Sequence, residues 1–180
     1  MSAIGDSTPA PHPPPPGGRR KRELTLSDPA WLIATWFGAG LLPWAPGTWG
    51  SLAALPFAWA IAWAGGAPAL AVAASVLFFV GWWAAEGVER ASGIADDGAI
   101  VIDEVVGQWL TLAAVPLDPR AYLLGFLLFR LFDIVKPWPV RWADRRIAGG
   151  LGVMADDVLA ALYAASALLL LRLLGRLFLG

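Results

Sequence analysis

The 180-residue sequence contains no cysteine, and this absence removes whole classes of chemistry. Disulfides, zinc–thiolate sites and cysteine nucleophiles are all excluded. The single histidine, His12, lies within a run of prolines, which does not hold a side chain in a fixed catalytic geometry. Hydrolases that depend on a histidine base or nucleophile are therefore excluded as well. Carboxylates, lysine, arginine and hydroxyl groups remain for chemistry.

Charged residues are also scarce, at 15% of the chain against 58% for hydrophobic residues. The 13 basic and 14 acidic residues leave a formal net charge of −1, so the protein lacks the basic field that holds a nucleic acid. Eleven tryptophans exceed what a soluble core of this size needs, and tryptophan gathers at membrane interfaces. The composition predicts a protein embedded in membrane lipids, with no nucleic-acid partner.

Two regions of different composition divide the chain. Residues 1–28 are rich in proline, glycine and serine and carry a basic run at 19–22, which predicts a disordered cytoplasmic tail. A cleaved signal peptide is the alternative, but no convincing cleavage site ends the first apolar stretch. Residues 29–180 are long enough for one core and are predicted to form a single membrane-embedded helical domain.

The apolar stretches predict an all-α fold. No charged residue or histidine occurs from residue 29 to residue 85, and prolines and glycines divide this span into pieces of about 31–43, 51–64 and 67–85. Later apolar pieces cover about 105–117, 121–135 and 158–171. We expect 31–43 to form a re-entrant or interfacial helix. Hairpins are predicted to turn at Gly65-Gly66 and at residues 118–120.

Basic residues predict the orientation in the membrane. Short basic loops stay on the cytoplasmic side, which places Arg141, Arg145 and Arg146 there. The loops 44–51, 86–104 and 136–157 then all face the cytoplasm. Arg172 and Arg176 oppose this orientation if 158–171 crosses the membrane, unless both side chains reach back to the far interface.

Acidic residues concentrate in two short segments, each just before an apolar stretch. They are Asp96, Asp97, Asp103 and Glu104 in the first segment, and Asp156 and Asp157 in the second. Magnesium binds one or two carboxylates together with water and substrate phosphate, so two acidic pairs at one membrane face favour a magnesium site. Helix capping is the alternative for each single residue, but it does not account for both members of both pairs.

A polar stripe interrupts one predicted helix at a spacing of three residues, formed by Arg130, Asp133 and Lys136. Ionisable residues within a membrane are costly and usually line a site. Prolines 137 and 139 end the helix and leave Lys136 near the interface, where a lipid phosphate lies. A structural ion pair between Arg130 and Asp133 is the alternative interpretation.

A glycine-rich turn precedes the predicted helix 51–64. Its backbone amides and the hydroxyls of Thr48 and Ser51 could receive an anion at the helix start. An ordinary turn with Ser51 as the N-cap would give the same sequence, and these residues alone favour that interpretation.

The order and spacing of these segments resemble the bacterial phosphatidylglycerophosphatase A family over about residues 28–172. The resemblance is carried by PGTWGS at 46–51, DDGAIVIDE at 96–104, FRLFDIVKPWP at 129–139 and GGLGVMADD at 149–157. It implies a magnesium-dependent enzyme that removes the terminal phosphate of phosphatidylglycerophosphate to give phosphatidylglycerol. It also implies a multi-pass protein of the bacterial cytoplasmic membrane. The implied fold is a compact helical bundle with a central helix wrapped by the others and active-site loops facing the cytoplasm.

The resemblance assigns Asp96, Asp103, Glu104, Asp156 and Asp157 as metal and catalytic carboxylates, with Arg130 and Lys136 on the substrate phosphates. Together with the polar stripe and the glycine-rich turn, three sets of residues are predicted. They are Asp96, Asp103, Glu104 and Asp133 as catalytic residues, Asp103, Glu104, Asp156 and Asp157 as metal ligands, and Thr48, Ser51, Arg130 and Lys136 as substrate-binding residues.

Two other classes of protein are alternatives. A CDP-alcohol phosphotransferase also uses carboxylates and magnesium at a membrane edge, but its Asp-Gly-x-x-Ala-Arg core is not matched after Asp97-Gly98. A membrane transporter would use buried carboxylates as an ion path. Weak internal repeats would favour a transporter, and the sequence shows none.

Overall fold

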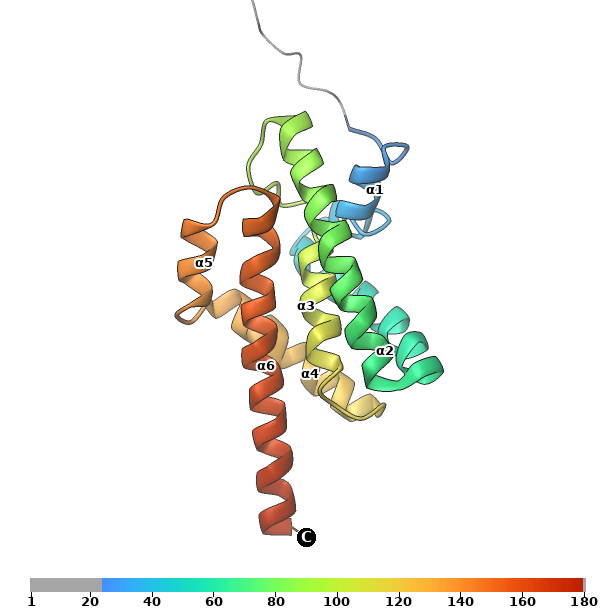
Figure 1. Cartoon of the computed structure of the whole chain (residues 1–180), viewed down its shortest axis with the longest axis vertical. Helices are drawn as coiled ribbons and strands as arrows, with labels where there is room; N and C mark the ends of the chain where they lie inside the picture. The colour runs from blue at the N-terminus through green and yellow to red at the C-terminus, as the bar shows by residue number, and fades with distance from the viewer. Residues whose placement is uncertain (1–23, 180) are drawn as a thin grey trace, which may run out of the picture.

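The computed structural model describes residues 24–179, and all regular structure within this range is helical (Figure 1). In chain order the helices are α1 Pro29–Ala34, the 3₁₀ helix η1 Ala39–Leu41, α2 Pro46–Ser92, α3 Ile102–Leu112, α4 Pro119–Val135, α5 Val140–Arg146 and α6 Gly150–Leu179. The all-α prediction is confirmed for the described residues. Most of the predicted tail, residues 1–23, lies outside them.

Helix α2 is a hairpin of two helical arms. Gly66 has φ 71° and ψ −173°, a conformation that breaks the helix and that glycine adopts without steric cost. A Cβ on Gly50 would lie 2.7 Å from Val101 Cβ, and one on Gly81 would lie 3.0 Å from Ile102 Cγ1. A straight helix would separate these glycines by about 46 Å, so the chain reverses between them. The predicted turn at Gly65-Gly66 is confirmed.

Helix α3 is enclosed by α2, α4 and α6. Eight of its 11 residues are buried, including Gln108 and Thr111. Trp109 Nε1 donates to the Ala54 carbonyl oxygen of α2 at 3.0 Å. Gly107 permits a close approach to α4, since a Cβ there would lie 2.5 Å from the Phe129 ring. Residues on the first turn of α3 are therefore held between three other helices.

The turn before α4 forms as its sequence predicts. Asp118 caps the helix by accepting from the backbone N–H groups of Arg120 and Ala121 at 2.9 and 3.0 Å, and Pro119 occupies the first turn. The helix ends at Lys136, whose backbone is left-handed with φ 46°. Two prolines follow closely and prevent the helix from continuing.

Three predictions of local structure are wrong. Residues 136–157 are not one loop, because α5 forms there by burying Val140 and Ala143, and α6 already begins at Gly150. Residues 31–43 do not form one helix, since left-handed backbone at Trp36 and Phe37 separates α1 from η1. The segments 44–51 and 86–104 are largely helical, because α2 covers 46–92 and α3 begins at residue 102.

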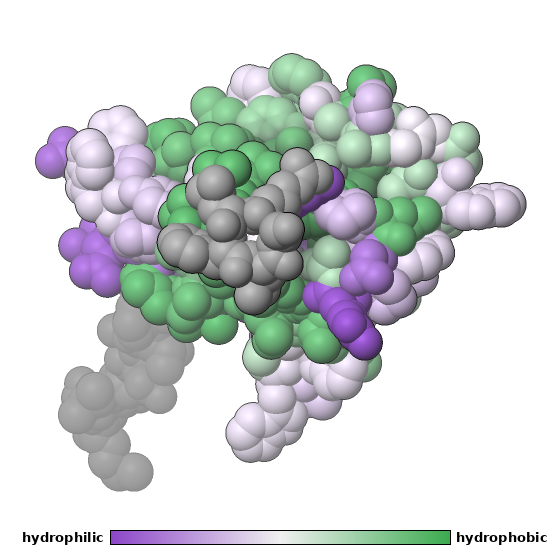
Figure 2. Space-filling view, turned by 90° about the horizontal axis from the view of Figure 1, so that it is seen from below, coloured by the Kyte–Doolittle hydropathy of each residue, from purple (hydrophilic) through white to green (hydrophobic). Residues whose placement is uncertain are grey.

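Helices α2 and α6 are long and apolar enough to cross a membrane, judged by length and composition over the described residues. Many large apolar side chains on them face outward; Trp63 and Phe79 are 79% and 64% exposed. The end of the molecule from which α6 emerges is mostly hydrophobic or neutral, with few strongly hydrophilic residues (Figure 2). These surfaces indicate association with lipid.

Candidate active site

A cavity of about 500 Å³ lies at the end of the molecule opposite the α2 hairpin turn. Residues from the start of α2, the loop after α2, α3, the end of α4, α5 and the start of α6 form its walls. Its charged lining comprises eight acidic residues, Glu89, Asp96, Asp103, Glu104, Asp133, Asp144, Asp156 and Asp157, and three basic residues, Lys136, Arg145 and Arg146. The cavity is therefore strongly acidic.

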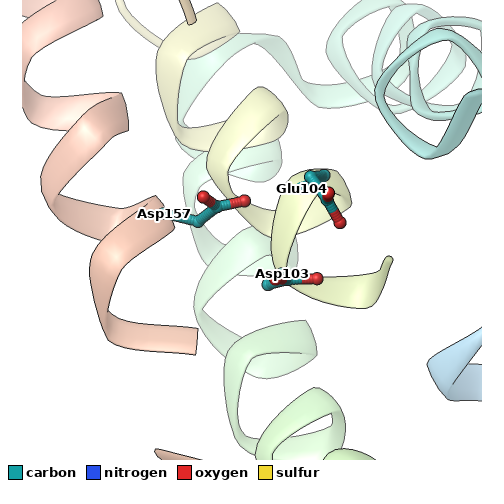
Figure 3. A group of neighbouring side chains, drawn as sticks. All are labelled: Asp103, Glu104 and Asp157. Atoms are coloured by element: carbon teal, nitrogen blue, oxygen red, sulfur yellow. The ribbon is translucent and has the colours of Figure 1, made fainter. Parts of the chain in front are cut away.

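Three of these carboxylates form a compact cluster. Asp103 and Glu104 lie on the first turn of α3, and Asp157 points toward them from α6 (Figure 3). One oxygen from each residue lies within 4.8 Å of the others. Asp103 Oδ1, Glu104 Oε2 and Asp157 Oδ2 are buried and have no hydrogen-bond partner among the described residues. Buried oxygens of this kind are costly unless a proton or a cation satisfies them.

The surroundings oppose ionisation of this carboxylate cluster, which we define as Asp103, Glu104 and Asp157. Burial raises the pKa of Glu104 to about 7, and the charge of Asp133 acts in the same direction while Arg130 opposes it. Burial raises the pKa of Asp103 well above its ordinary value, and the charges of Glu104 and Asp157 add to this effect. A bound cation would instead stabilise the ionised forms.

Two glycines allow the elements of the site to pack closely. A Cβ on Gly47 would overlap the Glu104 carboxylate, and it would also lie 3.1 Å from Arg130 Nη1. At the start of α6, the Gly150 N–H donates to Glu86 Oε2 at 2.9 Å, which fixes α6 against α2. A Cβ on Gly150 would lie 2.5 Å from the Glu86 backbone nitrogen, so a side chain does not fit at Gly150 any more than at Gly47.

The capping alternative fails for the second acidic pair. Asp156 and Asp157 lie on the second turn of α6, which begins at Gly150, so neither residue caps the helix. They are 6% and 2% exposed. Asp103 and Glu104 do lie in the first turn of α3, where negative charge favours the helix dipole. That effect does not require their oxygens to be buried next to Asp157.

The ion pair on α4, which was the alternative interpretation of the polar stripe, is present, and it extends to α3. Arg130 Nη1 lies 2.7 Å from Asp133 Oδ2 and 3.7 Å from Glu104 Oε1. The side chains of Arg130 and Asp133 are 13% and 12% exposed. Asp133 lines the cavity, while Arg130 is not among its lining residues. The guanidinium therefore holds two carboxylates of the site in place.

Lys136, at the end of α4, pairs with carboxylates of α5 and α6. Its ammonium donates to Asp156 Oδ2 at 2.7 Å and also to the Asp144 carboxylate. Burial by itself would lower the pKa of Lys136, but the bonds to Asp144 and Asp156 raise it above its usual value, so the side chain stays charged. Sequence reasoning missed Asp144. Its only signal is a single acidic residue among three arginines on α5.

The remaining predicted residues lie at different depths. Asp96 is exposed and lines the cavity, and its backbone N–H donates to Glu89 Oε1 at 2.7 Å. Glu89 also lines the cavity, and sequence reasoning missed it. Ser51 is buried in α2 and donates to the Gly47 carbonyl oxygen at 2.9 Å, so it is not the N-cap, a position that Ala45 occupies. Thr48 is half-buried on the first turn of α2 and does not line the cavity.

The donor set of the carboxylate cluster fits a hard divalent cation. It offers oxygen atoms alone, it is buried, and the cavity leaves room for water and phosphate beside it. Softer ions that prefer sulfur or imidazole find no suitable ligand, since the chain has no cysteine and its one histidine is distant in sequence.

A family model and two relatives of this chain carry the same family name. The model of the family described as phosphatidylglycerophosphatase A matches residues 32–172. A phosphatidylglycerophosphatase A of Escherichia coli K12 is 39% identical over 149 residues, covering 82% of this chain and 86% of the relative. The Haemophilus influenzae protein of the same name is 40% identical over 144 residues, covering 79% and 88%.

A third relative, from Bacteroides thetaiotaomicron, is 45% identical over 147 residues and covers 74% of this chain and 87% of its own length. Its name assigns it provisionally to a phosphatidylinositol-3-phosphatase activity. No solved structure matches the chain.

Proposed function

The chain belongs to the phosphatidylglycerophosphatase A family and is a phosphatase that acts on phosphatidylglycerophosphate, and we propose that it does so with Mg²⁺ bound by Asp103, Glu104 and Asp157. The products are phosphatidylglycerol and inorganic phosphate. The proposal assigns the chemistry to the acidic cavity and the lipid chains to the surrounding apolar surface.

The observation that carries this proposal is the charge of the cavity. Its lining has eight acidic and three basic side chains, and a phosphomonoester is itself an anion. Two unit charges about 5 Å apart repel by roughly 3 kcal/mol at an effective dielectric constant of about 20. The substrate phosphate therefore needs additional positive charge in the cavity, and a divalent cation on the carboxylate cluster would provide it.

In this proposal Asp103, Glu104 and Asp157 hold the ion, because one oxygen of each lies within 4.8 Å of the others and each residue has a buried oxygen without a partner among the described residues. Asp156, the fourth predicted ligand, is paired with Lys136 and orients the ammonium into the cavity. Lys136 then contacts the terminal phosphate. Arg130 acts on the phosphate indirectly, by fixing Asp133 and Glu104.

When bound, Mg²⁺ would neutralise the phosphomonoester and increase the acidity of an attacking water. The water forms the new P–O bond while the bond to the glycerol oxygen breaks, and one proton passes to that oxygen. Asp96 and Asp133 line the cavity and are the carboxylates proposed to accept the proton of the water. Direct attack by water is favoured because the Asp-x-Asp-x-Thr/Val motif of aspartyl-phosphate enzymes is absent.

We also propose that the α2 hairpin and α6 cross the bacterial cytoplasmic membrane and that the cavity faces the cytoplasm. Length and composition support the crossings. Arg141, Arg145 and Arg146 on α5 lie at the cavity end, and basic residues favour the cytoplasmic side. In this arrangement the enclosed helix α3 carries the site at the membrane edge.

The test is phosphate release from phosphatidylglycerophosphate by the purified protein in detergent micelles, with Mg²⁺ added or chelated. We expect turnover only with the ion, and no release from phosphatidylinositol 3-phosphate at comparable rates. Release that is unaffected by chelation would reject the metal role, and preference for the inositol lipid would reject the substrate. One turnover in ¹⁸O-labelled water should place the label in phosphate and none in the protein.

A further inference from the structure

The substrate proposed above carries two phosphates, and the acidic cavity accounts for the terminal one alone. A second groove, of about 450 Å³, adjoins this cavity and shares Lys136, Arg145 and Arg146 with it. We propose that this groove binds the phosphodiester and glycerol backbone of the lipid, an inference that rests on the proposed function. The groove would then determine which phosphomonoesters the enzyme accepts.

The arginines of the groove differ from the other cations of the site. Arg130 and Lys136 both form ion pairs with carboxylates. The side chains of Arg145 and Arg146 are exposed and have no hydrogen bond or ion pair within residues 24–179, although acidic residues line the same cavity. Arg141 donates to the Val135 carbonyl oxygen at 3.3 Å and to no carboxylate of the described chain. Three guanidinium groups are thus available for an anion.

Helix α5 presents two of these arginines on one face. Arg141 and Arg145 are four residues apart and lie on the same face, while the buried Val140 and Ala143 lie on the opposite face. Like charges at this spacing destabilise an isolated helix. The helix dipole accounts for positive charge in the last turn at Arg145 and Arg146, but it opposes positive charge in the first turn at Arg141. An anion bound between them would remove this repulsion.

The other wall of the groove is apolar and well suited to a lipid. Val135, Pro137, Trp138 and Trp142 form it, and Trp138 is 77% exposed. The Tyr163 hydroxyl donates to the Trp138 carbonyl oxygen at 2.7 Å, which ties this segment to α6. Tryptophan prefers the level of lipid headgroups and ester groups. Cationic and aromatic walls together match a phosphodiester attached to a diacylglycerol.

Two fragments of the substrate separate the two binding regions. Short-chain dihexanoyl-phosphatidylglycerol, used as dissolved monomers, has the diester without the terminal phosphate, and inorganic phosphate has the reverse. Both are measured as competitive inhibitors of the wild type, Arg145→Ala, Arg146→Ala and the control Arg120→Ala at the far end of α4. We expect the lipid inhibition constant to rise about tenfold in the groove variants, while that of phosphate changes less than about twofold. Arg145→Lys should recover part of the loss, because it restores charge without the planar guanidinium.

Other outcomes would overturn the proposal. Equal weakening of both inhibitors would place Arg145 and Arg146 on the terminal phosphate, and unchanged inhibition would leave the groove without a role in binding. Calorimetric binding of the same lipid to the wild type and variants gives a readout that does not require turnover. If the wild type binds the lipid through these arginines but releases no phosphate, the proposed function fails and the groove assignment stands.

Discussion

Two groups of charged residues belong to the site, and they differ in how far the protein itself neutralises them. Lys136 pairs with Asp144 and Asp156, and Arg130 pairs with Asp133. The carboxylate cluster of Asp103, Glu104 and Asp157 has buried oxygens without a partner among the described residues. Both groups come from helices that pack closely, so packing does not explain the difference.

The comparison separates charges that the protein balances by itself from charges that it leaves for a ligand to balance. Paired charges stabilise the arrangement of α4, α5 and α6, and breaking a pair leaves its partner uncompensated. Unpaired buried carboxylates weaken the fold in the absence of a ligand, and such cost is typical of sites that bind one. Substitutions in the two groups should therefore affect stability and turnover in opposite proportions.

The largest effect is expected from Asp103→Asn and Glu104→Gln, which remove one negative charge and keep the size of the side chain. Turnover should fall by about 10³-fold, roughly 4 kcal/mol of activation free energy, because the cation and the transferring phosphoryl group lose a partner. The metal-free thermal midpoint should stay the same or rise, because a neutral amide replaces a buried carboxyl group whose ionisation the surroundings oppose. Initial rates against Mg²⁺ concentration and circular dichroism on heating give both quantities.

Asp118→Asn is the matched control for these variants. Asp118 caps α4, and Asn caps a helix about as well as Asp. If Asp103 served only its helix end, Asp103→Asn would behave like this control. Near-normal rates and an unchanged Mg²⁺ requirement in both cluster variants would contradict the metal site.

A paired residue should show the opposite behaviour. Arg130→Met would leave Asp133 and Glu104 without their cation in a setting that is only slightly exposed, at a cost of about 3 kcal/mol of unfolding free energy. Adding Asp133→Leu should recover much of this loss, since the stranded charge is then absent, and the double-mutant cycle measures the coupling. A stable Arg130→Met protein with only a higher KM would instead show that Arg130 contacts the substrate.

A third test displaces the cluster without changing any charge. The Cβ of Gly47→Ala would overlap the Glu104 carboxylate and crowd Arg130, so Glu104 must move. We expect kcat to fall by about ten- to a hundredfold, because misplaced catalytic groups lose much of their effect. Gly175→Ala is the control, since no atom lies within 4 Å of a Cβ at that position. Equal activity of the two variants would show that the position of Glu104 is unimportant.

The sequence predicts the parts of this structure that depend on local signals. The turns at Gly65-Gly66 and at residues 118–120 follow from glycine conformation and from a proline at the start of a helix. Asp103, Glu104 and Asp157 are predicted from acidic pairs next to apolar stretches, and the structure brings these three together. Their common cavity lies between distant segments, and the sequence alone gives neither the distances nor the partners.

The missed features arise from tertiary packing. Helix α5 has seven residues, too few for a clear periodic pattern, and it forms against α6. The early start of α6 depends on the Gly150 N–H reaching Glu86, 64 residues away. Asp144 enters the site through α5, so a sequence that predicts a loop over residues 136–157 gives no sign of its role.

The smallest effect is expected at Thr48, because the sequence predicts that it binds substrate but the structure places it outside the cavity lining. A hydroxyl at a helix start can bind an anion, so the sequence predicts that Thr48 contacts phosphate. In the structure Thr48 does not line the cavity, and the nearby Ser51 hydroxyl is committed to the Gly47 carbonyl oxygen. Thr48→Val, which removes the hydroxyl at nearly constant volume, should change kcat/KM by less than about twofold, or 0.4 kcal/mol. A tenfold rise in KM at unchanged kcat, measured with phosphatidylglycerophosphate at saturating Mg²⁺, would show that substrate binding brings Thr48 into the site.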